Sequence, residues 1–274
     1  MMSKRLAIHM SAAAAIGSVL LTGVMLSGVT AHADNDKDNG NGNGNACSQV
    51  PNYAQLKAAL TTARGVANGG FNLDMWGSIV NRDGIVCAVA FTGSDRGAQW
   101  PGSRVISAQK ANTANSFSLP GLALSTANLW AAVQPGGSLF GLQESNPVDT
   151  GAAYQGPSSK FGTSNDPLVG VKIGGINVFG GGLALYNSHH ILVGAVGVSG
   201  DTSCADHNIA WRTRHLLNMD YVTGGVGPAA RPDTINYQGL VAVPSLANDF
   251  SHPVCSIAGD NGVVGISALL PATQ

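Results

Sequence analysis

The turn Arg82-Asp83-Gly84 constrains the fold of this chain more than any other feature of its sequence. It joins two strand-like runs, 76–81 and 85–91, and its Asp-Gly pair tolerates the positive φ angles that a tight hairpin turn requires. A second hairpin is predicted from 178–186 and 191–198, with its turn at 187–190. Strands joined by hairpins run antiparallel, so the sequence predicts an antiparallel sheet.

Helical segments are predicted around and between the hairpins. Apolar residues at helical spacing start at Tyr53 and stop before Gly69-Gly70, and a last helix is predicted from Asp206 onward. Two more helices are predicted over 107–117 and 123–133. The predicted class is therefore α+β, with the helices expected to cover one side of the sheet.

The segment 135–167 is rich in turn residues and is predicted as a loop, in which 138–143 could form a short strand. Strict alternation of strands and helices is missing from the whole chain. A doubly wound nucleotide-binding fold is therefore disfavoured.

Residues 1–33 have the three parts of a secretory signal. Lys4 and Arg5 form a basic head, an apolar stretch runs to about Val29, and Ala31-His32-Ala33 forms a small-residue cleavage site. We expect cleavage after Ala33 and a secreted or periplasmic protein; an uncleaved membrane anchor is the alternative. Residues 34–46 are expected to form a flexible polar leader, and no second long apolar run follows.

The four cysteines all lie after the predicted signal, and an even number in an oxidising compartment predicts two disulfides. Three pairings are possible. We favour Cys47 with Cys255, joining the ends of the domain, and Cys87 with Cys204, joining two interior segments. The rival interpretation is a metal site, for which the spacing of Cys204 and His207 is the one suggestive pattern.

Composition and missing motifs exclude several classes of function. The formal net charge is −1 and charged residues make up 11% of the chain, which disfavours a nucleic-acid-binding protein with a basic face. The sequence has no G-x-S-x-G elbow, phosphate-binding loop or H-E-x-x-H helix. Paired carboxylates and nucleophile–base arrangements do not stand out either.

Two stretches of sequence resemble the GlcG/HbpS-like haem-binding family, which includes the C-terminal domain of PduO-type proteins. The first is the hairpin at 82–84 followed by AQKANTA at 108–114. The second is GGGL at 180–183, followed by GAVGVSG at 194–200 and a helix headed by Asp206. The resemblance covers roughly residues 53–219. This chain departs from the family in its cysteines, its long insertion before Gly180, and His189-His190 in place of an Asp-Gly turn.

The resemblance implies a profilin-like antiparallel sheet with flanking helices, haem or a related tetrapyrrole as the cofactor, and a homo-oligomer. It divides the mature chain into a family domain, 47–219, and an extension, 220–274, expected to pack on that domain.

A haem site needs an apolar slot, an axial ligand and cations for the propionates. The family's helix places Lys110 as a propionate partner and Thr113 as a weak oxygen ligand of the iron, and Arg104 adds charge. His207 is the stronger ligand chemically, because imidazole suits iron. The turn at Gly197, Ser199 and Gly200 would let the backbone approach the ligand closely.

Each of these residues also has a purely structural interpretation. Lys110 could be a solvated helix lysine, Thr113 could bond back to a helix carbonyl, and His207 could be a capping or core-edge residue. The residues 197–200 could simply form a tight strand-to-helix turn.

The sequence as a whole predicts an exported haem-binding protein that serves in haem capture or redox sensing. Two alternatives remain: a small-molecule oxidoreductase or isomerase that uses the same pocket, and a disulfide-stapled interaction module.

Overall fold

A computed structural model of the chain describes residues 46–238, 249–255 and 263–274, all within the unit Asn39–Gln274. The predicted signal peptide and nearly all of the polar leader lie outside the described residues. Within those residues, no helix is both long and apolar enough to cross a lipid bilayer.

Four antiparallel strands form the sheet, in the order β2-β1-β4-β3. They are β1 (Trp76–Asn81), β2 (Val86–Phe91), β3 (Gly182–Tyr186) and β4 (Leu192–Ser199). Both predicted hairpins are confirmed, and Gly84 has a φ of 75° in the first turn, as the Asp-Gly pattern predicts. The two hairpins are joined by pairing of β1 with β4, so these strands are central.

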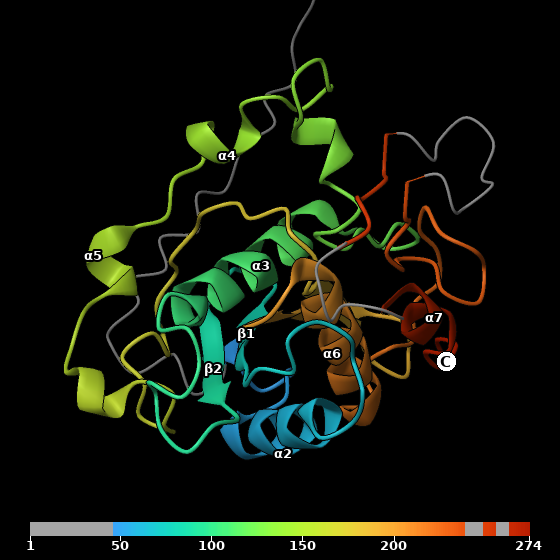
Figure 1. The fold of residues 1–274 in the computed structure, drawn as a ribbon. Coiled ribbons are helices and arrows are strands. Elements are labelled where there is room, and N and C mark those ends of the chain that lie inside the picture. The colour runs from blue at the N-terminus through green and yellow to red at the C-terminus, as the bar shows by residue number, and fades with distance from the viewer. Residues whose placement is uncertain (1–45, 239–248, 256–262) are drawn as a thin grey trace, which may run out of the picture. The chain divides into compact units, whose positions relative to one another are not determined.

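Helices lie on both faces of the sheet, which corrects the expectation that they cover one side. Helix α3 (Ser103–Phe117) packs on one face, and α2 (Tyr53–Arg64) and α6 (Ser203–Leu216) pack on the other (Figure 1). The reason is that β1 and β4 are buried at every residue, so each face needs a cover. The α+β class with flanking helices is confirmed.

Helix boundaries differ from the predicted ones by about one turn. The first helix, α2, ends at Arg64 with Gly65 as its C-cap, before Gly69-Gly70. The helix α3 begins at Ser103 rather than at residue 107, and α6 begins at Ser203, where Thr202 caps its N-terminus. The C-terminal segment adds α7 (Val263–Ala268).

The predicted helix over 123–133 is wrong except for a 3₁₀ turn, η1 (Ala131–Val133). Its backbone N–H groups are used elsewhere: that of Ala123 donates to Gly224 O at 2.8 Å, and that of Thr126 donates to Gly182 O at 3.1 Å. Because these bonds connect the segment to distant parts of the chain, they compete successfully with the local helix.

The segment 135–167 is loop-like, as predicted, but the short strand over 138–143 is not found. The segment instead carries three single-turn elements: α4 (Leu142–Ser145), α5 (Thr150–Ala153) and η2 (Ser158–Lys160). The segments of α5 and η2 lie beside the N-terminal end of α3, and α4 lies beside its C-terminal end (Figure 1).

The disulfides pair Cys47 with Cys87 and Cys204 with Cys255, so the favoured pairing is wrong. The segment before α2 lies against the first hairpin, where Asn81 Nδ2 donates to Ala46 O at 2.9 Å, and this brings Cys47 beside β2. The existence of two disulfides is confirmed.

Parts of the described chain after Met219 contact α6. Arg214 forms a buried ion pair with Asp233, and Trp211 Nε1 donates to Pro271 O at 3.0 Å. The predicted boundary at residue 219 between a family domain and an extension stays a prediction.

Candidate functional site

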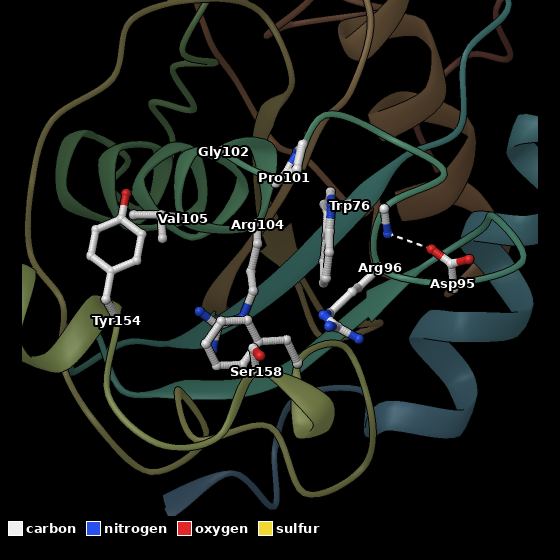
Figure 2. Close-up of a pocket in the computed structure, with 11 residues that line it drawn as sticks. Trp76, Asp95, Arg96, Pro101, Gly102, Arg104, Val105, Tyr154 and Ser158 are labelled. Carbon is white, nitrogen blue, oxygen red and sulfur yellow. Dashed lines mark hydrogen bonds between the residues drawn. The ribbon is translucent and has the colours of Figure 1, made fainter.

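A pocket of about 640 Å³ lies at the N-terminal end of α3. Its walls come from β1, the loop after β2, the first turn of α3, and the segment that carries α5 and η2 (Figure 2). The lining residues are Trp76, Asp95, Arg96, Gly97, Pro101, Gly102, Arg104, Val105, Tyr154, Ser158 and Phe161.

Apolar side chains form the inner wall of the pocket. Trp76 is 1% exposed and packs edge-on against Phe91, with their ring centroids 5.2 Å apart. Val105 is buried on the first turn of α3, and Phe161 packs against the same cluster as Trp76. Among the described residues, the indole N–H of Trp76 has no hydrogen-bond partner. The inner wall is therefore apolar, and the unpaired indole N–H lies buried behind it.

Arg104 organises the wall formed by the segment after α5. Its Nε donates to Asp166 Oδ2 at 2.9 Å, its Nη1 donates to Ala153 O at 2.9 Å, and its guanidinium carbon lies 3.6 Å from the centre of the Phe161 ring. Asp166 also accepts the N–H groups of Gly162 and Leu168, at 2.6 and 2.8 Å. Arg104 is thus a buried, charge-paired residue that positions Phe161.

Polar side chains on the rim remain open to solvent. Asp95 accepts the Gly97 N–H at 2.6 Å, which shapes the turn that presents Arg96. Arg96 is exposed and forms no ion pair within the described part of the chain. Tyr154 is 60% exposed, and Figure 2 shows it and Arg96 on opposite sides of Arg104. The rim therefore combines an unpaired cation with a phenol.

Of the seven residues predicted from the sequence, Arg104 alone lines this pocket. Lys110 and Thr113 lie further along α3 and are buried. Lys110 Nζ donates to Asp206 Oδ2 at 2.8 Å and to Val198 O at 3.1 Å. Burial raises the pKa of Asp206 to about 6, although the Lys110 charge opposes the shift. Thr113 Oγ1 donates to Gln109 O at 2.8 Å, the back-bonding expected of a helix threonine.

His207 is fully buried in α6. Its Nε2 accepts the N–H of Ile235 at 3.1 Å, and its Nδ1 has no partner among the described residues. Burial, aided by the Arg214 charge, lowers the pKa of His207 to about 3, so the imidazole is neutral. The structure therefore places His207 inside the protein, with one nitrogen already bonded.

Gly197, Ser199 and Gly200 lie where β4 passes beneath α3 and turns toward α6. A Cβ at Gly197 would overlap the backbone of Ser107, and one at Gly200 would overlap the backbone of Asp74. Ser199 Oγ donates to Ser103 Oγ at 3.2 Å. Gly197 and Ser199 therefore share one tightly packed contact between α3 and β4.

Sequence reasoning missed the residues that open the pocket. Trp76 was assigned only to a strand, and Tyr154 and Phe161 lie in a segment that was predicted only as loop. An aromatic residue in an insertion beside turn residues is the one signal that could have marked Tyr154 or Phe161, and it is a weak one.

The sequence matches one protein-family model, described as "Haem degrading protein HbpS-like", over residues 52–214. A search of curated proteins finds no match.

Solved structures with a similar fold include a PduOC–heme complex, with 22% identity over 60% of this chain and 91% of that chain (TM-score 0.42). Others are Klebsiella pneumoniae protein ORFY (26% identity, 60% and 86% coverage, TM-score 0.40) and a double mutant of Streptomyces reticuli HbpS (16%, 60% and 82%, TM-score 0.39). The family of this chain is given by the family model. Because that model matches more than half of the 274 residues, the chain belongs to the HbpS-like family.

Proposed function

We propose that this chain is an exported haem-binding protein and that its ligand occupies the pocket at the N-terminal end of α3. The observation that carries the proposal is an apolar pocket of about 640 Å³ with an unpaired arginine at its rim. The chain that holds it belongs to a family whose description names haem. Pockets for cofactors are typically about 300–1,000 Å³ and mostly apolar, with a few placed polar groups.

The residues of the pocket fit a porphyrin chemically. The rings of Trp76 and Phe161 and the side chain of Val105 suit the flat apolar macrocycle, and Arg96 suits its propionates. The phenol of Tyr154 is an oxygen donor of the kind that holds haem iron in some proteins. Bound haem would supply a redox-active iron.

The site predicted from the sequence, with Thr113 or His207 as the iron ligand and Lys110, Gly197, Ser199 and Gly200 around it, is the rival location. Thr113 and His207 are 0% exposed, and Lys110 is already paired with Asp206. Haem could reach these buried residues only if the elements packed around them moved apart. We therefore favour the open pocket, to which Arg104 contributes the wall.

Export is supported by the two disulfides, because such bonds persist mainly in oxidising compartments. A carrier outside the cytoplasm would serve haem capture or redox sensing, and we propose one of these roles, in a homo-oligomer. Gel filtration with light scattering tests the oligomer, and the mass of the mature N-terminus tests cleavage after Ala33.

The test of the site is a hemin titration of the purified protein, followed through the Soret band. We expect saturation near one haem per chain, weaker binding by Arg96→Ala, and a shifted band for Tyr154→Phe. Thr113→Val and His207→Ala serve as controls for the rival location and should bind normally when folded.

Two outcomes would count against the proposal. Normal binding by Arg96→Ala and Tyr154→Phe, with loss in His207→Ala but not in His215→Ala, would move the site to the interior. Absence of any saturable spectral change would reject haem binding. If the Soret band bleaches steadily after a reductant and oxygen are added, the protein degrades haem rather than only holding it.

A further inference from the structure

A second cluster of reactive side chains lies at the start of α6. It consists of Cys204, His252 and Cys255, whose ligand atoms all lie within 4.8 Å of one another. None of the three lines the pocket at α3. Cys204 and His252 are buried and Cys255 is half-buried, and the two cysteines form a disulfide.

The imidazole of His252 is oriented as in a metal ligand. Its Nδ1 lies 2.7 Å from the carbonyl oxygen of Pro253, which can only accept, so Nδ1 carries the proton. Its Nε2 lies 3.1 Å from Ser203 Oγ and carries the lone pair, which accepts the hydroxyl hydrogen here and could bind a metal in its place. A backbone carbonyl that fixes the tautomer in this way is the usual outer partner of a histidine that binds a metal.

The surroundings of the two sulfur atoms favour thiolates. Cys204 is the second residue of the 14-residue helix α6, whose N-terminus stabilises negative charge. Cys255 Sγ lies 3.2 Å from the N–H of Cys204 and 3.4 Å from Ser203 Oγ. The other disulfide differs, because Cys87 lies within β2 and its sulfur is 3.5 Å from the carbonyl oxygen of Ile85.

Unpaired polar atoms lie next to the cluster. The Nδ1 of His207 and both polar atoms of the Asn236 side chain have no partner among the described residues, although both side chains are buried. Asn236 is adjacent to the cluster, since its carbonyl oxygen accepts the N–H of His252 at 2.8 Å. Buried polar groups are normally hydrogen-bonded, so these unpaired atoms are available to hydrogen-bond a water or a ligand of a metal bound at the cluster.

We propose that Cys204, His252 and Cys255 form a zinc site that becomes available when a dithiol reduces the Cys204–Cys255 bond. Two thiolates and one imidazole are preferred zinc ligands, and three protein ligands leave a fourth position for water. The site is separate from the proposed haem pocket, so either assignment can fail without the other.

The reduction proceeds by two thiol–disulfide exchanges. A thiolate of the dithiol attacks Cys255 Sγ, the more exposed sulfur, and forms a mixed disulfide with it. The Cys204–Cys255 bond breaks, and its electron pair leaves with Cys204 as a thiolate at the α6 N-terminus. The second sulfur of the dithiol then displaces the Cys255 thiolate and closes into a cyclic disulfide. The dithiol loses two electrons and two protons, the protein gains the electrons, and zinc keeps its charge.

The test compares oxidised protein with protein reduced by dithiothreitol, which is removed without oxygen before zinc or cobalt(II) is added. We expect about one zinc per chain in the reduced protein and none in the oxidised protein. Cobalt should give a thiolate charge-transfer band. His252→Gln should weaken zinc binding by at least about 10-fold, because it removes one of the three protein ligands.

Matched variants separate the two disulfides. Reduced Cys47→Ser/Cys87→Ser should bind zinc normally, whereas Cys204→Ser/Cys255→Ser should not bind it. Near-ultraviolet circular dichroism reports whether each sample is folded, and His252→Gln, which keeps all four cysteines, decides the result if the serine variants unfold.

Three results would overturn the proposal. They are no zinc in the reduced folded protein, zinc affinity unchanged in His252→Gln, and loss of the native fold when the protein is reduced, since the site requires the folded frame.

Discussion

The middle of helix α3 and its N-terminal end differ in how closely the sheet approaches them. At the middle, glycines of the sheet face the helix, and a Cβ at Gly182 or Gly197 would overlap the helix backbone at Lys110 or Ser107. At its N-terminus the sheet presents Trp76, and a pocket lies beside it. Glycine allows backbones to touch, whereas a large ring keeps them apart. One helix therefore has a closed middle and an open N-terminal end.

The charged residues at the middle of α3 and at its N-terminal end have correspondingly different roles. Lys110 and Asp206 form an ion pair in which each side chain is only 2% exposed. Arg104 is equally buried, but its partner Asp166 lies in a loop and the pair positions a wall of the pocket. A buried charge thus stabilises the packed interior at the middle of α3, and another shapes the wall of the pocket at its N-terminal end.

Lys110→Ala should have the largest effect on stability. It leaves Asp206 buried without its partner, and breaking a buried pair typically costs about 3–5 kcal/mol. Urea unfolding measures the loss. A Lys110→Met/Asp206→Asn double variant is the control and should recover part of it. If Lys110→Ala costs less than about 1 kcal/mol, the closed middle of α3 is not as tightly packed as described.

Reduction of the disulfides should have the next largest effect. The bonds span 40 and 51 residues in sequence, and a disulfide typically contributes about 2–4 kcal/mol. We expect dithiothreitol to lower the melting temperature. Hemin affinity should change little in protein that remains folded, because no cysteine lines the pocket. An unchanged melting curve would show that the bonds are not structural.

The burial of His207 should also make stability depend on pH. Because burial lowers the pKa of His207 from 6.5 to about 3, the unfolded chain takes up a proton near pH 6.5 while the folded protein does not. Stability should therefore fall as the pH falls, by about 1.4 kcal/mol between pH 7.5 and 5.5 for this one group.

The measurement is urea unfolding at both pH values for the wild type and for His207→Gln, which should lose less stability on acidification. His252, whose pKa burial lowers to about 4, contributes equally to both proteins. Identical pH dependence in the two proteins would contradict the buried position of His207.

Tyr154→Ala at the open end should have the smallest effect on stability. The side chain is 60% exposed, and substitutions at such positions usually change stability by less than about 0.5 kcal/mol. Its effect on hemin binding should be the larger one, seen in the Soret titration. A large loss of stability with unchanged hemin binding would show that Tyr154 serves the fold and not the pocket.

Local patterns were sufficient to predict the four strands and the three long helices. The hairpin at Asp83-Gly84 and the helix that carries Lys110 depend on residues that are near neighbours in the chain, so periodicity and turn chemistry identify them. The same patterns could not predict that 123–133 is irregular, because Asn128 donates to the carbonyl oxygen of Thr234, a residue far along the chain.

The candidate site was predicted least well, and the reason is physical. The residue types chosen for haem, a lysine, a threonine and a histidine, are equally suited to satisfying one another's hydrogen bonds inside a protein. The sequence does not state which polar residues will be buried, and only Arg104 was placed at the pocket.

The sequence by itself determined the α+β class, the two hairpins, the presence of an even set of cysteines and the family to which the chain belongs. The tertiary structure decided which cysteines pair, which face each helix covers, and where the chain is open. Those features depend on contacts such as Arg104 with Asp166, 62 residues apart in sequence, and no local pattern specifies such a distance.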